Sequence, residues 1–145
     1  MAILQNGEDE MKRVIALLLL LATAFSLVSC TGMRREPAAY KAAIERMYGE
    51  QLEVVLYEDM SDRQVWGSAF GINGVVIDTI LIISYEGEVS GYVVYFKASN
   101  NATDAVKKFR LALSMSSLED TCVVKRRGTV VFMGDKKLWR DIKWV

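Results

Sequence analysis

The chain has 145 residues, 52% of them hydrophobic, and its 18 basic residues balance its 18 acidic residues. This length suits one compact domain, and the neutral net charge predicts no nucleic-acid partner. The sequence contains no histidine, which excludes catalysis by Ser-His or Cys-His pairs and zinc sites built on histidine. We also expect no metal site and no bound cofactor.

The strongest pattern lies near the N-terminus. Lys12-Arg13 precede an apolar or small-residue run from Val14 to Val28, and Ser29-Cys30 follow it. A basic start and an apolar run of this length are typical of a signal peptide. As a helix the run would extend only about 22 Å at roughly 1.5 Å per residue, which is short of the roughly 30 Å hydrocarbon core of a bilayer. An uncleaved membrane anchor and an ordinary buried helix are the alternatives.

The four residues Leu27-Val28-Ser29-Cys30 resemble the lipobox of bacterial lipoproteins, and the resemblance covers residues 11–30. It implies that the Cys30 sulfur receives a diacylglyceryl group, that palmitate is incorporated, and that the preceding peptide is removed. Residues 1–29 would then be the signal peptide. Because residues 1–10 place three acids ahead of the basic region, Met11 is the expected true start. The implied location is the cell membrane, lipid-anchored and facing outside the cytoplasm.

A lipid on Cys30 would leave Cys122 without a disulfide partner, because the chain has only these two cysteines. The lipidated cysteine and a short tether are expected at residues 30–36, and a single globular domain at 37–145. Six tether residues at about 3.5 Å each reach roughly 20 Å, so the domain should stay close to the bilayer.

The predicted elements follow from apolar spacing and turn residues. A helix is expected from Pro37 to Tyr48, then a strand at 52–57 and an acidic loop at 58–62. Strands at 65–72, 75–84 and 88–97 should form an antiparallel meander, because Asn73-Gly74 and Glu86-Gly87 are turn pairs.

Asn101 is the expected N-cap of a further helix, whose apolar residues recur on one face over 102–113. Strands at 121–126 and 129–133 and a helix from 136 to about 143, capped by Asp135, complete the chain. The sequence thus predicts an α+β domain with one antiparallel sheet of about five or six strands. Two or three helices should cover one face of this sheet, and a signal-peptide helix should precede it.

A single cysteine and an acidic loop are two candidate sites. Cys122 lies within a predicted strand and has no histidine to activate it, which favours an inert buried thiol over a nucleophile or redox thiol. The acidic loop with Glu58, Asp59 and Asp62 could hold calcium, but its spacing departs from the calcium-loop pattern and favours a solvated turn.

Charge is distributed unevenly, with a net of −5 over residues 34–95 and +6 over residues 96–145. Anionic lipid would attract a basic surface by about 1 kcal/mol for each well-placed basic residue. The alternative is an ordinary solvated face with its tryptophans packed inward. The densest groups are Lys125-Arg126-Arg127 and Lys136, Lys137, Arg140 and Lys143 with Trp139 and Trp144.

Residues 71–76 and 85–89 resemble the sheet of exported flavin-binding domains, which attach FMN to a threonine in a Ser-Gly-Ala-Thr motif. Here Asn100-Asn101-Ala102-Thr103 stands in a similar place, with asparagines instead of serine and glycine. The resemblance implies a flavin-carrying redox protein with FMN on Thr103. The alternative is that Asn101 and Thr103 cap a helix.

These patterns favour a membrane-anchored envelope lipoprotein whose domain has a non-enzymatic binding or accessory role. Its expected partners are the membrane, through the lipid on Cys30, and another envelope protein. The alternative is the exported flavin-carrying redox protein with FMN on Thr103.

Overall fold

The computed structural model describes residues 2–29 and 31–145, which form two compact units, Met1–Thr31 and Gly32–Val145. In the first unit the helix α1 spans Ala2–Ser29. Cys30 lies outside the described residues. Across the described part of the chain, no helix combines the length and the apolar character needed to cross a membrane. The signal peptide and the lipobox remain predictions.

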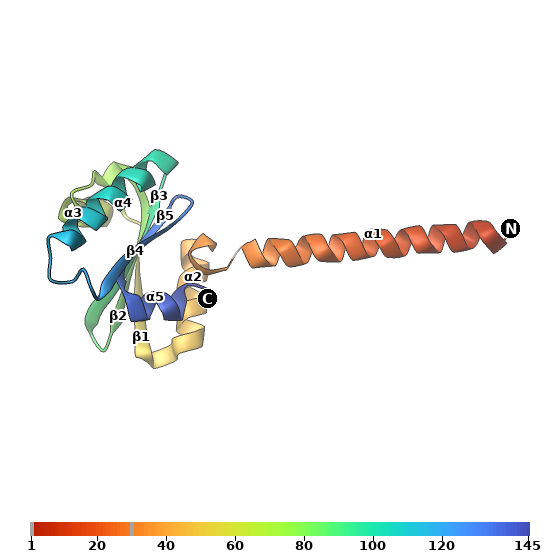
Figure 1. Cartoon of the computed structure of the whole chain (residues 1–145), viewed down its shortest axis with the longest axis horizontal. Coiled ribbons are helices and arrows are strands. Elements are labelled where there is room, and N and C mark those ends of the chain that lie inside the picture. The colour runs from red at the N-terminus through yellow and green to blue at the C-terminus, as the bar shows by residue number, and fades with distance from the viewer. Residues whose placement is uncertain (1, 30) are drawn as a thin grey trace. The chain divides into compact units, whose positions relative to one another are not determined.

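The second unit is built on a five-stranded antiparallel sheet in the order β1-β2-β3-β5-β4 (Figure 1). This confirms the predicted α+β class with one antiparallel sheet. Strands β1 to β3 form a meander, whereas β5 lies between β3 and β4. The strands span Leu52–Tyr57 (β1), Ile77–Tyr85 (β2), Glu88–Phe96 (β3), Cys122–Arg127 (β4) and Val130–Asp135 (β5).

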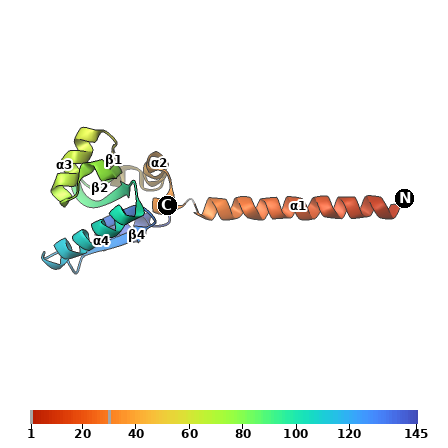
Figure 2. The same ribbon diagram turned by 90° about the horizontal axis from the view of Figure 1, so that it is seen from above.

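Helices cover both faces of this sheet, whereas the sequence predicted cover on one. Helices α2 (Pro37–Tyr48) and α5 (Lys136–Ile142) pack on one face, against Leu81, Val93 and Phe132. Helices α3 (Met60–Phe70) and α4 (Ser99–Ser114) pack on the other face, as both views of the ribbon show (Figures 1 and 2). Alternate residues of a strand point to opposite faces, so the central strands are apolar on both sides.

The strand predicted at 65–72 is wrong, because residues 65–70 belong to helix α3 and Gly71 caps its end. The helix places Trp66 and Phe70 on one face, where their rings lie 5.8 and 5.1 Å from the ring of Tyr92. The predicted Asn73-Gly74 hairpin is also wrong. Asn73 instead caps a short 3₁₀ helix, Gly74–Val76, by accepting a hydrogen bond from the Val75 amide (3.1 Å).

The other ends of elements fall close to their predicted positions. Helix α2 and strand β1 have the predicted bounds, and the turn at Glu86-Gly87 joins β2 to β3 with positive φ at both residues. Asp135 caps α5 as predicted, its Oδ1 accepting a hydrogen bond from the Lys137 amide (2.8 Å). Asn101 is not an N-cap, because α4 begins at Ser99 and already includes it.

Candidate functional site at the N-terminal junction of the domain

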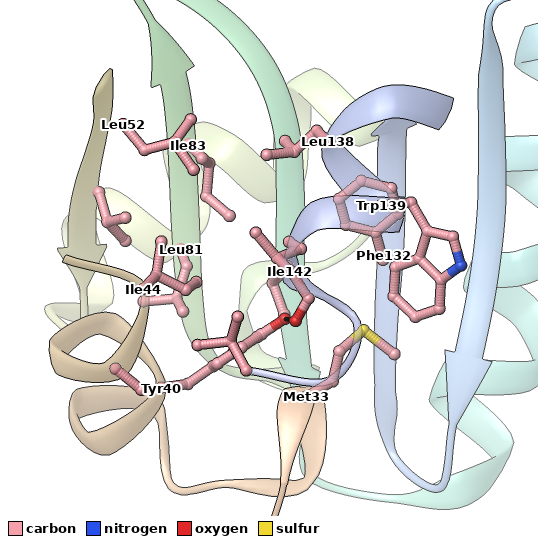
Figure 3. Packing of buried hydrophobic residues seen from close by; sticks show 14 of the residues in the cluster. Met33, Tyr40, Ile44, Leu52, Leu81, Ile83, Phe132, Leu138, Trp139 and Ile142 are labelled. Atoms are coloured by element: carbon pink, nitrogen blue, oxygen red, sulfur yellow. Dashed lines mark hydrogen bonds between the residues drawn. The ribbon is translucent and has the colours of Figure 1, made fainter. Parts of the chain in front are cut away.

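The folded domain begins two residues after Cys30. Gly32–Arg34 form a 3₁₀ helix, and both Gly32 and Met33 are buried. Figure 3 shows Met33 in the same apolar cluster as Tyr40 from α2 and Trp139 from α5. Within the segment predicted as a tether, residues 30–36, Gly32 and Met33 are thus packed against the domain, whereas Arg34 and Glu36 are exposed.

Gly32 is fitted tightly against the C-terminal end of the domain. Its φ is +62°, and a Cβ at this position would overlap the carbonyl oxygen of Lys143 and approach Nη1 of Arg127 to 3.3 Å. Figures 1 and 2 show the C-terminal end of the chain beside the segment that leads into α2. The start and the end of the domain therefore form one continuous surface.

Arg127 is held between two tryptophans on this surface. Its guanidinium carbon lies 5.3 Å from the ring centre of Trp139 and 4.5 Å from that of Trp144, which are cation–π distances. Its Nη1 also donates a hydrogen bond to the Lys143 carbonyl oxygen (3.0 Å). Trp139 is packed inward, as one alternative predicted, but Trp144 is 67% exposed. The side chain of Lys143 lies over the Trp144 ring as well, at 5.9 Å.

Further arginines extend this surface across α2. Arg35, Arg46, Met47 and Val145 line a shallow hollow of about 280 Å³, and Arg35 Nε donates a hydrogen bond to the Val145 carbonyl oxygen (2.8 Å). Arg34 and Arg46 are exposed, and Met47 is 66% exposed. We use the name junction surface for a set of seven residues, five of which are basic. It comprises Arg34, Arg35, Arg46, Met47, Arg127, Lys143 and Trp144.

Tyrosine hydroxyls fix the position of α5, which carries part of this surface. Tyr40 donates to the Ile142 carbonyl oxygen (2.7 Å), and Tyr48 to the Asp141 carbonyl oxygen (2.6 Å). Tyr85 donates to Oδ2 of Asp141 (2.7 Å). Burial raises the pKa of Tyr85 well above its usual value, and the hydrogen bond and charge of Asp141 raise it further. These bonds hold the C-terminal helix against α2 and β2.

Two buried tyrosines should respond differently to loss of the hydroxyl. Tyr95 has no hydrogen-bond partner among the described residues, whereas Tyr40 bonds Ile142. Tyr40→Phe should therefore lower the free energy of unfolding by about 1 kcal/mol at pH 7, and Tyr95→Phe should leave it unchanged or raise it. Urea unfolding of both variants checks this, and a larger loss in Tyr95→Phe than in Tyr40→Phe would contradict it.

Burial raises the pKa of both Tyr40 and Tyr95. The unfolded chain therefore loses these protons at a lower pH, near 10, than the folded protein does. The stability they contribute is complete below that pH and declines as the pH rises above it. At pH 11 each Phe variant should lose less stability, relative to its own value at pH 7, than the wild type loses.

Thr103 lies within α4, not at its start. Its hydroxyl donates to the Ser99 carbonyl oxygen (3.1 Å) and accepts a hydrogen bond from Nη1 of Arg126 (2.6 Å). Arg126 also contacts Ser99 through Nη2, so its guanidinium is turned toward α4. In this arrangement Thr103 and Arg126 connect α4 to β4.

The remaining candidates lie apart from the junction surface. Cys122 is a half-buried free thiol on the edge strand β4. Asp59 stands at the N-cap position of α3, so part of the predicted acidic loop belongs to a helix. Glu58 lines a separate hollow of about 330 Å³ together with Arg63 and Asp78. In residues 2–29 and 31–145, the structure groups no three metal-ligating side chains closely enough to hold a metal ion.

The basic C-terminal residues and both tryptophans stand out in the sequence, whereas Arg34, Arg35 and Arg46 do not. Arg34-Arg35 follow Cys30 within five residues, and this proximity is the signal that could have drawn attention to them. The junction surface is thus a basic surface with one exposed aromatic ring, that of Trp144. In comparisons with known proteins, no family model, curated protein or solved structure matches the chain.

Proposed function

We propose that the chain is a lipoprotein of the bacterial cell envelope, held to the membrane by acyl chains on Cys30. Its domain acts there as a non-enzymatic binding or accessory module. The observation that carries the proposal is the apolar run Val14–Val28, which ends in Leu27-Val28-Ser29-Cys30 next to a folded domain that starts at Gly32. Each buried methylene of an acyl chain contributes about 0.8 kcal/mol, so two chains on one cysteine give stable attachment.

The position of Cys30 supports this role in a second way. Only Thr31 separates it from the buried Gly32, so processing at Cys30 would remove residues 1–29 and leave the second unit whole. The apolar clusters on both faces of the sheet lie entirely within residues 33–145. A cleaved protein would therefore keep its complete core.

Replacing Cys30 by serine should abolish incorporation of labelled palmitate and release the protein from the membrane fraction, because serine offers no thiol for the diacylglyceryl group. The measurement is labelling of the full chain expressed in a bacterium, followed by fractionation and intact mass. Cys122→Ser is the matched control and should retain label and membrane attachment. Palmitate remaining on the Cys30→Ser protein would overturn the proposal.

The same mass measurement distinguishes the acylated protein of this proposal from the alternative, a protein that carries FMN. FMN on Thr103 would add its own mass and give a yellow protein, which Thr103→Ala would make colourless. A colourless protein with the mass of an acylated chain beginning at Cys30 would remove that alternative.

A further inference from the structure

The junction surface lies next to the residue proposed to carry lipid, and the inference made here rests on that proposal. Two consecutive peptide units separate the Cα atoms of Cys30 and Gly32 by at most about 7 Å. Gly32 in turn packs against the Lys143 carbonyl oxygen and the Arg127 guanidinium. Acyl chains on Cys30 would therefore bring these groups to the level of the lipid headgroups.

The chemistry of the surface suits that place. It brings together five basic side chains, from residues 34–35, α2, β4 and the C-terminal end. Trp144 presents an exposed ring beside Arg127 and Lys143. Tryptophan is favoured at the boundary between hydrocarbon and water, because its ring is apolar and its N–H is polar. Basic side chains in the same layer are attracted to anionic headgroups.

We infer that the junction surface binds the headgroups of anionic phospholipids in the membrane that holds the lipid anchor, with Trp144 inserted in the interfacial layer. The acyl chains supply attachment, and this surface fixes the orientation of the domain. Helices α3 and α4 pack on the opposite face of the sheet from α2 and α5, so they would remain available to another envelope component.

Two other basic residues lie at α4, away from the junction surface. Arg126 is engaged by Ser99 and Thr103, and Lys108 donates a hydrogen bond to the Gly71 carbonyl oxygen (2.7 Å). Lys107 and Arg110 are exposed on α4, which covers the other face of the sheet. These two residues provide a matched set of charges for a control.

The test uses the acylated full-length product, purified and reconstituted into vesicles of phosphatidylcholine alone or of phosphatidylcholine mixed equally with phosphatidylglycerol. Quenching of tryptophan fluorescence by acrylamide reports exposure to water, and quenching by lipids brominated near the headgroup reports insertion. Comparison with Trp144→Phe isolates the signal of Trp144 from those of the buried Trp139 and the half-buried Trp66. On anionic vesicles, acrylamide quenching of Trp144 should fall several-fold, and added salt should restore it.

A second test removes basic charges from the junction surface and, as a control, from α4. Arg46→Gln with Lys143→Gln should lower the ratio of docked to undocked domain roughly 25-fold, at about five-fold for each basic residue near an anionic surface. Lys107→Gln with Arg110→Gln removes the same charge from α4 and should leave the ratio unchanged. Equal effects of the two pairs would mean that net charge, not this surface, directs the domain.

The outcomes separate this inference from the proposal on which it rests. If the protein carries the mass of its acyl chains but Trp144 is equally accessible on neutral and anionic vesicles, the headgroup inference is overturned and the lipoprotein proposal stands. If the protein carries no acyl chain, the lipoprotein proposal fails, and this inference fails with it.

Discussion

Replacing Phe132 by alanine should lower the free energy of unfolding by about 3–5 kcal/mol, the usual cost of removing a fully buried phenylalanine. Phe132 lies on β5 between β3 and β4, is completely buried, and packs against Trp139 with ring centres 5.1 Å apart. Single domains have only about 5–15 kcal/mol of stability in total, so this change should remove much of it.

The cost should be high because of two glycines under the ring. Gly91 on β3 pairs with Gly134 on β5, so neither strand offers a side chain there. A Cβ at Gly91 would lie 2.8 Å from Cε2 of Phe132, and a Cβ at Gly134 would lie 3.1 Å from Cζ. The aromatic ring therefore occupies the space that the glycines leave open, and alanine cannot fill it.

Urea unfolding of the full chain, followed by circular dichroism, measures this loss. Phe132→Leu keeps most of the buried volume and should cost less than about 1.5 kcal/mol. Val89→Ala on the exposed part of β3 should change stability by only a few tenths of a kcal/mol. A loss below 1 kcal/mol for Phe132→Ala, or equal losses for alanine and leucine, would show that the ring does not support the sheet in this way.

The sequence predicted correctly the helices and strands whose ends are marked by a proline, a glycine or a capping residue next to them in the chain. Pro37 begins α2 and Gly49 follows its end, so both bounds could be placed correctly. Asp135 could be identified as the cap of α5 for the same reason. The β2–β3 hairpin follows from Glu86-Gly87, because this pair adopts the positive φ values that a tight turn requires.

Helix α3 shows where local signals were insufficient. Val65, Trp66 and Phe70 have strong strand preferences, and Asn73-Gly74 resembles a hairpin turn. In the structure, Phe70 instead lies edge-on to Phe109 of α4, with ring centres 5.4 Å apart. Only the helical i, i+4 spacing brings Trp66 and Phe70 together onto the aromatic cluster of this face. Packing between elements distant in the sequence thus outweighed local preference.

The junction surface was predicted only in part for a similar reason. The basic character of residues 96–145 is visible in the sequence, and it includes Arg127 and Lys143. Arg34, Arg35 and Arg46 were hidden because they belong to a region whose net charge is negative. Arg35 bonds a residue 110 positions away, and no local pattern indicates such a contact.

Replacing Gly32 by alanine should separate the first residues of the domain from its C-terminal end. An L-residue at φ +62° lowers the free energy of unfolding by about 1–2 kcal/mol through backbone strain. The added Cβ would also overlap the Lys143 carbonyl oxygen, and overpacking of this kind typically lowers it by a further 1–3 kcal/mol. The 3₁₀ helix can relieve this overlap only by moving away, which would expose Met33. We expect a total loss of about 2–5 kcal/mol in the free energy of unfolding.

Gly128→Ala is the matched control, because Gly128 has nearly the same φ, +61°, and open space around it. It should show only the cost of the backbone conformation, so the difference between the two variants measures the contact with Lys143. Equal losses in urea unfolding would mean that Gly32 is not held against the C-terminal end.

The same variant tests how the anchor controls orientation. Release of residues 32–36 would lengthen the tether by roughly 17 Å at about 3.5 Å per residue. The acylated Gly32→Ala protein would keep Cys30 and the basic residues of α2, β4 and the C-terminal end in place, whereas Arg34 and Arg35 would move with the released segment. Trp144 should then become more accessible to acrylamide on anionic vesicles. Acylated Gly128→Ala should quench like the wild type. If Trp144 in acylated Gly32→Ala is quenched as it is in the wild type, charge alone orients the domain. The short connection to the lipid would then contribute nothing measurable to the orientation.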